Sequence, residues 1–287
     1  MCKHSAVGSY ATKSNRYCTL QLIAKQLKQL GYKLKSAQNI KPKHIEALTK
    51  YWNGQNVNGN KDKPLATGTI KNRMSHLRYW AENVGKASII AKDNEAYGIQ
   101  KREFYKGNKA QKLDLYKMTN ISCERVKMAI RLQAAFGLRR EEALKFRPSL
   151  ADQGNKIALK ASWTKGGRAR EIPITTERQR ALLDEARELV GGASMIPADK
   201  TYIQHLRTYK HEIAKANMGK LHGLRHNYAQ WRYKTLTGME PPAAGGEKYR
   251  DLNESGKIMD TIAREQISAE LGHGRLDVTN VYLGGRK

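Results

Sequence analysis

The spacing of apolar residues constrains the fold more than any other feature of this sequence. Most of the chain places its apolar residues three and four apart, which is the period of an amphipathic helix. Only residues 156–160 and 170–174 alternate apolar and polar side chains, and they flank a turn at Lys165-Gly166-Gly167. Two short strands around such a turn are typical of a β-hairpin. The pattern therefore predicts a mainly α fold with one small β-hairpin or sheet, an α+β class.

The length of the chain and a change in its composition predict two domains. A chain of 287 residues can form two ordinary domains, each with its own core. Residues 94–112 are charged and lack a clean period, as expected of a linker. We expect a helical N-terminal domain with its linker over residues 1–112 and a second domain over residues 113–287. The expected helices cover residues 15–30, 42–52, 69–83, 122–136, 139–146, 176–190, 200–216, 221–236 and 260–272.

The chain is strongly basic, with a formal net charge of +27 at pH 7. Residues 1–110 hold 21 basic and 6 acidic residues, so more than half of the excess lies in the first part of the chain. Such a charge attracts and concentrates a polyanion, and nucleic acid is the expected partner. Charge alone leaves a ribosomal or nucleoid-type binding protein open as an alternative.

The sequence favours neither a membrane protein nor an oxidising compartment. No apolar run approaches the roughly 18 residues of a membrane-spanning helix, and the start of the chain lacks the apolar core of a signal peptide. The three cysteines Cys2, Cys18 and Cys123 are odd in number and far apart, which argues against both a disulfide framework and a zinc site. We therefore expect a cytoplasmic protein.

The helix expected at residues 69–83 has one apolar stripe and one basic, polar stripe. Charged stripes on helices usually face solvent, but the charge of the whole N-terminal part favours a face that contacts DNA. Arg168, in the glycine-rich turn of the hairpin, is a further candidate. The candidate DNA-binding residues are therefore Lys71, Asn72, Ser75, Arg78 and Arg168.

Six further residues are candidates for chemistry, although each has an ordinary explanation by itself. An arginine or a turn lysine is usually solvated, a histidine after Leu-Gly often ends a helix, and a His-x-x-Arg pair occurs often by chance. His222 and Arg225 are three apart on an expected helix, so they share one face. The six are Arg139, Lys165, His222, Arg225, His273 and Tyr282.

The local sequences around these residues carry a resemblance to a known family. They read Gly137-Leu-Arg139-Arg-Glu-Glu142-Ala-Leu144, then His222-Gly-Leu-Arg225-His226, then Leu271-Gly272-His273 with Tyr282 nine positions on. In this order they resemble the blocks of the tyrosine recombinase, or phage-type integrase, family. The resemblance implies a two-domain DNA clamp with a catalytic domain and a helical core-binding domain, which residues 66–77 match in helical pattern.

The two arginines suit a site that acts on a phosphodiester. Attack on phosphorus develops negative charge on the non-bridging oxygens, and guanidinium groups can bind those oxygens through two parallel hydrogen bonds. Arg139 and Arg225 are the candidates for this clamp.

The remaining four residues suit nucleophilic attack and proton transfer. A phenol has an ordinary pKa of about 10, so it needs positive surroundings and a base to attack. Lys165 is the candidate general acid for the departing 5′-hydroxyl, while His222 and His273 are expected to position phosphate oxygens and assist proton transfer. The resemblance implies that Tyr282 becomes joined to the DNA 3′-phosphate.

No cofactor and no metal are expected. The sequence has no GxxxxGK[ST] phosphate-binding loop and no compact acidic cluster near the motifs. A phosphotyrosine linkage keeps the bond energy, so rejoining to a 5′-hydroxyl requires no ATP.

Two features depart from the family pattern. Arg225 and His273 are 48 positions apart, about twice the usual separation, and the excess is expected as an inserted loop around residues 236–257. Only five residues follow Tyr282, too few for the helix with which many relatives contact a neighbouring subunit. The resemblance still implies a homotetramer on specific double-stranded DNA sites, with accessory DNA-bending or directionality factors in some cases, and the contact between subunits is then made differently.

The leading function is site-specific recombination for the integration or excision of a mobile element, in a bacterial or phage context and at the nucleoid. A type IB-like topoisomerase keeps the same chemistry with a different outcome. A non-catalytic DNA-binding protein of the same fold is the alternative from another class.

Overall fold

The computed structural model describes residues 8–55, 63–103, 105 and 107–286. The chain divides into two compact units, Met1–Glu103 and Phe104–Lys287, and the division falls inside the expected linker. The predicted mainly helical fold is confirmed, and a single two-stranded antiparallel sheet accompanies the helices in the described ranges. Among the described helices, none combines the length and apolar character needed to cross a membrane.

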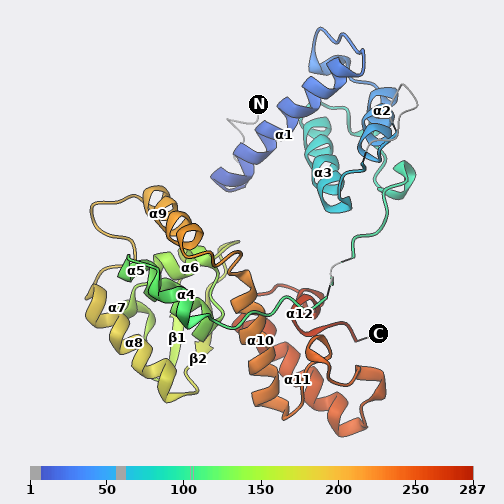
Figure 1. Cartoon of the computed structure of the whole chain (residues 1–287). Coiled ribbons are helices and arrows are strands. Elements are labelled where there is room, and N and C mark those ends of the chain that lie inside the picture. Colours follow the sequence, from blue (N-terminus) through green and yellow to red (C-terminus); the bar gives the residue numbers. More distant parts are fainter. Residues whose placement is uncertain (1–7, 56–62, 104, 106, 287) are drawn as a thin grey trace. The chain divides into compact units, whose positions relative to one another are not determined.

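In its described residues, the N-terminal unit has three α-helices and short 3-10 turns (Figure 1). The helix expected at residues 42–52 has its predicted bounds. The first helix begins at Tyr10, five residues earlier than predicted, because Ser9 caps it. The Ser9 hydroxyl accepts a hydrogen bond from the Thr12 amide. The core forms around Trp52, which is fully buried and donates its indole N–H to Gln26 Oε1 at 3.0 Å. The helices are α1 (Tyr10–Gln29), α2 (Pro42–Trp52) and α3 (Thr67–Asn83), with 3-10 turns at Ala37–Asn39, Ala87–Ile89 and Glu95–Tyr97.

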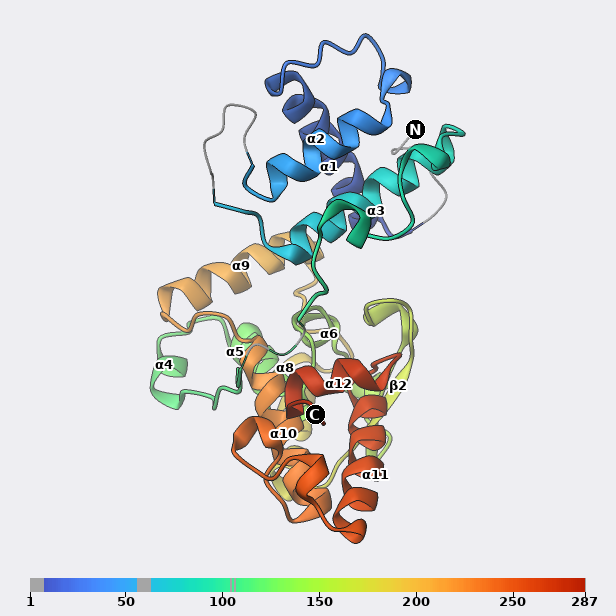
Figure 2. The ribbon, with the colours of Figure 1, turned by 90° about the vertical axis from the view of Figure 1, so that its right-hand side faces the viewer.

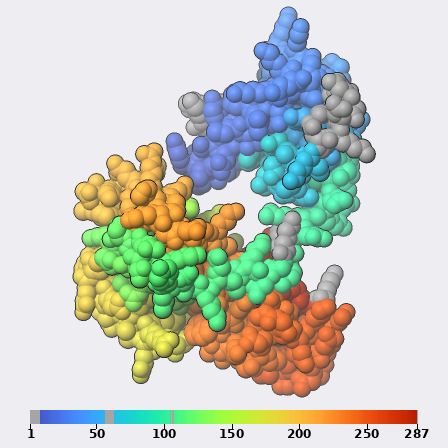
Figure 3. Space-filling view, viewed as in Figure 1, coloured from blue at the N-terminus to red at the C-terminus, as the bar shows by residue number. Residues whose placement is uncertain are grey.

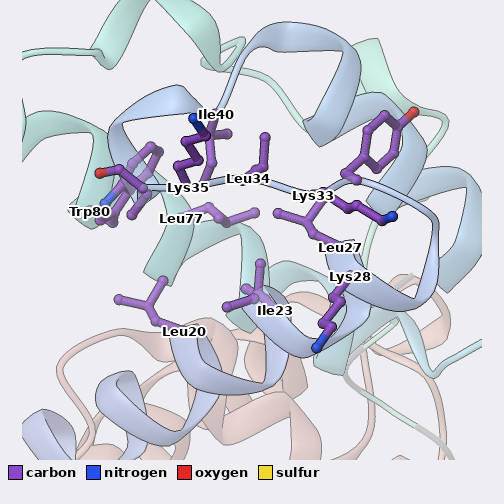
Figure 4. Close-up of a pocket in the computed structure, with 14 residues that line it drawn as sticks. Leu20, Ile23, Leu27, Lys28, Lys33, Leu34, Lys35, Ile40, Leu77 and Trp80 are labelled. Carbon is purple, nitrogen blue, oxygen red and sulfur yellow. The ribbon is translucent and has the colours of Figure 1, made fainter.

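An apolar pocket of about 550 Å³ opens in this unit between α1, the segment that follows it, and α3 (Figure 4). Ile23 and Leu27 of α1 and Leu77 and Trp80 of α3 supply apolar walls. Three lysines also line the pocket, namely Lys28, Lys33 and Lys35.

The C-terminal unit is built around α5, most of whose apolar residues are buried. This helix packs against α6, α8, α9 and α10, so it forms the centre of the core. The predicted hairpin is present, with Ile157 opposite Ile172 and both fully buried. The elements are α4 (Leu115–Thr119), α5 (Glu124–Phe136), α6 (Arg140–Lys145), α7 (Pro148–Ala151), β1 (Lys156–Leu159), β2 (Arg170–Pro173), α8 (Glu177–Val190), α9 (Tyr202–Lys215), α10 (His222–Thr237), α11 (Glu254–Glu270) and α12 (Leu276–Leu283), with 3-10 turns at Ala161–Trp163, Pro242–Ala244 and Tyr249–Asp251.

Helices α10, α11 and α12 pack together and carry the end of the chain (Figure 2). Two details differ from expectation. Residues 254–257, expected in the inserted loop, belong to α11, because the Asn253 side chain caps the helix by accepting a hydrogen bond from the Gly256 amide at 2.8 Å. The short helix α12 was not predicted, and it packs on both longer helices. The space-filling view shows mainly orange atoms on this part of the unit, and little of the red end of the chain is visible there (Figure 3).

Candidate active site

Five of the six predicted chemical residues come from four separate elements of the C-terminal unit. Arg139 directly precedes α6, and His222 and Arg225 lie on the first turn of α10. His273 follows the end of α11, and Tyr282 lies on α12. The contacts described below bring these side chains together.

Lys165, the sixth residue, is exposed in the segment between β1 and β2. It lines a pocket of about 760 Å³ together with Arg139 and His222. The lysine therefore lies at the border of the site, on a segment that the two strands anchor.

Arg225 is the most deeply buried cation of the site, with a relative exposure of 1%. Its Nη1 donates to the Gly137 carbonyl oxygen at 2.5 Å, and its Nη2 donates to the Leu271 carbonyl oxygen and lies 3.4 Å from His273 Nε2. Burial, and then the charge of Arg139, lowers the pKa of Arg225 to about 10, so it stays a cation at neutral pH. Its Nε has no partner among the described residues, which leaves one buried donor for an anion.

Arg139 is more open, with 24% of its side chain exposed. Its backbone amide donates to Glu142 Oε2 at 2.7 Å, and its Nη1 donates to Glu142 Oε1 at 2.9 Å. Burial tends to raise the pKa of Glu142, but hydrogen bonds and charge from Arg170 outweigh it and lower that pKa to about 2. The carboxylate is therefore ionised, and it holds the arginine from one side while the other side faces the pocket.

Tyr282 lies between two imidazole rings and is only 6% exposed. Its ring centroid is 4.3 Å from that of His226 and 5.1 Å from that of His273, with interplanar angles of 32° and 29°. Its hydroxyl lies 3.3 Å from His222 Nε2, and Arg225 Cζ is 5.8 Å from its ring centroid. The phenol is thus held in contact with a potential base and near a cation.

The three histidines around the phenol have lowered pKa values, and burial is the largest cause for each. The pKa of His273 falls to about 3, with Arg225 and Arg139 as the next causes, and that of His226 falls to about 4, with His222 and Lys109 next. The pKa of His222 is lowered by burial and then by Arg225 and Arg139. Neutral imidazoles result, and His222 with its proton on Nδ1 can accept the phenolic proton at Nε2.

Several residues of this site were not predicted from the sequence. Glu142 and His226 stood in the quoted motifs without a role, and Thr279, whose Oγ1 is 3.0 Å from His273 Nδ1, had no signal at all. Arg170 had no signal either, because its partner Glu142 is 28 positions away in the chain.

The predicted DNA-binding residues occupy different environments. Asn72, Ser75 and Arg168 are exposed, and Lys71 is half-buried. The guanidinium of Arg78 donates to the Ala91 carbonyl oxygen and to Asn94 Oδ1. Their contact with DNA stays a prediction. Among the described residues, no group of three or more His, Cys, Asp or Glu side chains could hold a metal ion.

Comparisons with known proteins match this architecture. A family profile described as phage integrase, N-terminal, matches residues 1–90, and one described as integrase matches residues 100–231. A comparison with curated protein sequences gives no match.

Solved structures have the same fold at low sequence identity. A lambda integrase dimer bound to a COC′ core site is 15% identical with a TM-score of 0.60, over 99% of this chain and 73% of that chain. The Tn1549 transposon integrase in complex with circular intermediate DNA is 14% identical with a TM-score of 0.52, over 99% and 93%. XerH site-specific recombinase bound to difH, in a pre-cleavage complex, is 19% identical with a TM-score of 0.50, over 93% and 74%.

The two profiles cover most of the chain, and the fold agrees with them. The chain belongs to the tyrosine recombinase family. As a member of this family, it is an enzyme of DNA strand cleavage and transfer.

Proposed function

We propose that the protein is a site-specific recombinase that cleaves and rejoins double-stranded DNA through a covalent 3′-phosphotyrosine. The observation that carries the proposal is the hydroxyl of Tyr282 at 3.3 Å from His222 Nε2, beside the cation of Arg225. A nucleophile, a neutral base and a fixed positive charge are the groups that attack on a phosphodiester needs.

In the proposed reaction, Tyr282 Oη forms a bond to phosphorus while its proton passes to His222. The bond between phosphorus and the 5′-oxygen breaks, and Lys165 donates a proton to that oxygen. Arg139 and Arg225 bind the non-bridging oxygens, whose charge grows during the step. Attack by the 5′-hydroxyl of another strand then reverses these events and releases the tyrosine. No ATP enters this balance, because the phosphotyrosine keeps the energy of the original linkage.

The partner and the setting follow from the same chemistry. The net charge of +27 fits a long polyanion, and the structures named above include proteins in complex with DNA. We propose that a homotetramer assembles on paired sites, with accessory DNA-bending or directionality factors, to integrate or excise a mobile element. The enzyme would act in the cytoplasm, at the nucleoid of a bacterial or phage-infected cell.

The test is to trap the covalent complex. Nicked duplexes tiled across the DNA that flanks the gene serve as probes, because loss of the short strand after cleavage prevents religation. The expected result is a denaturation-resistant complex with the wild-type protein and none with Tyr282→Phe. The matched control is Tyr116→Phe, at an 82% exposed tyrosine of the same unit, which should form the complex at the wild-type level.

The other outcomes separate the alternatives. An adduct that persists in Tyr282→Phe shows that another residue is the nucleophile. Adducts and plasmid relaxation that do not depend on the flanking sites would indicate a topoisomerase. DNA binding without any adduct would indicate a non-catalytic DNA-binding protein.

A further inference from the structure

Arg170, the first residue of β2, is a buried cation to which the reaction above gives no role. Its side chain is 4% exposed, and it donates three hydrogen bonds. Nη1 and Nη2 bind the two oxygens of Glu142 at 2.9 and 2.6 Å, and Nε binds the Glu270 carbonyl oxygen at 2.8 Å. One side chain therefore joins the hairpin, α6 and the end of α11.

The partners of Arg170 are the groups that hold proposed reacting residues. Glu142 accepts the backbone and side-chain hydrogen bonds of Arg139. Glu270 is the last residue of α11, three positions before His273. The hairpin segment that ends at Arg170 carries Lys165. The three contacts thus lead to three different parts of the site.

The packing at the end of α11 leaves little freedom for this side chain. Gly272 has a φ of +63°, and a Cβ built there would lie 2.9 Å from Arg170 Cδ. The glycine lets the chain turn directly against the arginine, one residue before His273. A shift of the Arg170 side chain would therefore displace the backbone that carries His273.

The physical chemistry of buried ion pairs argues that geometry is the main effect of this contact. Desolvation of a buried pair cancels much of its Coulombic gain, so such pairs contribute little net stability compared with apolar replacements. A bidentate guanidinium–carboxylate pair, however, fixes both groups in one plane. Lysine cannot reproduce three donors in this arrangement, because its ammonium is a single point of charge.

We propose that Arg170 is a positioning residue that sets Arg139, through Glu142, and His273, through the end of α11, relative to the hairpin that carries Lys165. The inference rests on the proposed function, since it concerns the rate of the same strand cleavage. Arg170 itself touches neither the phosphate nor Tyr282 in this scheme.

The test measures the single-turnover rate of adduct formation at saturating nicked DNA, alongside the dissociation constant for the same duplex. A displacement on the order of 1 Å at a reacting group lowers rates by about 100-fold. We expect Arg170→Met and Arg170→Lys each to lose about this factor in rate. The dissociation constant should change by less than about threefold, because Arg170 itself does not touch the phosphate. Loss of a direct contact worth 1.4 kcal/mol would change this constant by about tenfold.

The matched control is Arg180→Met. Arg180 also pairs with a buried carboxylate, that of Asp152. When Arg180 is replaced, Asp152 still has Arg187 as a partner at 2.5 Å, just as Glu142 still has Arg139 when Arg170 is replaced. This control should lose some thermal stability but keep its rate. A purely structural role for Arg170 predicts the same behaviour for both methionine variants.

A double-mutant cycle adds a readout that a general loss of stability would not produce. Because Arg170 reaches Arg139 through Glu142, the rate loss of the double variant Glu142→Gln/Arg170→Met should be smaller than the product of the losses of the two single variants. Single losses that multiply fully in the double variant, or a folded Arg170→Met or Arg170→Lys enzyme with a rate within threefold of wild type, would overturn the proposal. Should Arg170→Met fail to fold, the lysine variant decides. Absence of an adduct with the wild-type protein would instead contradict the proposed function.

Discussion

The neutral histidines around Tyr282 determine how the site responds to acid. A proton on His226 would place a second positive charge in a buried cluster that already holds Arg225, with His222 and Lys109 nearby. The same holds for His273, whose pKa is also strongly lowered by burial and by the arginines. Protonation of either ring should therefore oppose the packing around the phenol.

The pH dependence of stability tests this at a single residue. The pKa of His226 is about 4 in the folded protein and near its ordinary value of 6.5 in the unfolded chain, so the unfolded chain binds more protons between these values. The free energy of unfolding should thus fall as the pH drops from 6.5 to 4, by about 2–3 kcal/mol from this group alone. Denaturant titrations of wild type and His226→Phe, which keeps an aromatic ring beside Tyr282, measure the difference.

His226→Phe should show a shallower loss over that pH range. The control is His211→Phe at an exposed histidine, which should follow the wild-type curve. Parallel curves for wild type and His226→Phe would contradict the lowered pKa.

At the level of elements, helix ends place the reacting residues. Gly137 ends α5 with a φ of +59°, and its carbonyl oxygen accepts the hydrogen bond of Arg225. Two residues later Arg139 begins the approach to α6. The end of α11 places His273 in a similar way. The Leu271 carbonyl oxygen, two residues before His273, also accepts a hydrogen bond from Arg225.

Substitution of Gly137 by alanine should be costly for two separable reasons. The left-handed conformation costs an L-residue about 1–2 kcal/mol. In addition, the new Cβ would lie 2.5 Å from Cδ1 of the buried Tyr228 ring, and such overpacking costs about 1–3 kcal/mol more. Gly238→Ala is the control, because Gly238 ends α10 with a φ of +73° and has open space around it. Equal losses of unfolding free energy in the two variants would rule out the packing argument.

Helix ends also explain how much of the fold the sequence could predict. Pro42 marked the start of α2 and the alternation around residues 156–174 marked the hairpin, because these signals are local. The short helix α12 was missed because only packing on α10 and α11 stabilises eight residues as a helix. The start of α11 at Glu254 was missed because a Gly- and Pro-rich loop precedes its Asn253 cap.

The candidate site was predictable only where its residues recur in local motifs. The six candidate residues lie in such motifs or in the hairpin turn, so they could be proposed from the sequence, but the groups that hold them could not. Arg170 meets Glu142 and Glu270 across 28 and 100 positions, and such long-range contacts leave no periodic pattern in the chain.

For the whole molecule, charge is the dominant property, and it predicts the response to salt. Each phosphate contact releases counterions, so six or more contacts should weaken DNA binding by about 10³-fold or more between 50 and 200 mM salt. Equilibrium titrations of a fluorescent duplex at several salt concentrations measure the slope. A nearly flat response would contradict the DNA clamp.

Two lysine variants test the contribution of a single residue of the N-terminal unit to this salt dependence. Lys71→Ala should lower the magnitude of the salt slope by about one, as expected for one lost phosphate contact. Lys86→Ala removes the same charge from a lysine whose Nζ donates to the Gln38 and Ile40 carbonyl oxygens, and it should leave the slope unchanged. Equal slopes in both variants would remove Lys71 from the DNA-binding face.

The place of Arg170 in β2 limits how this enzyme can be rebuilt from its relatives. A hairpin exchanged as a cassette would bring a foreign residue to the position that meets Glu142 and the last turn of α11. Even a strand of matching length and register would then leave an ionised carboxylate with one partner fewer. A chimaera of residues 156–173 should therefore keep an arginine at position 170, whatever loop it carries between the strands.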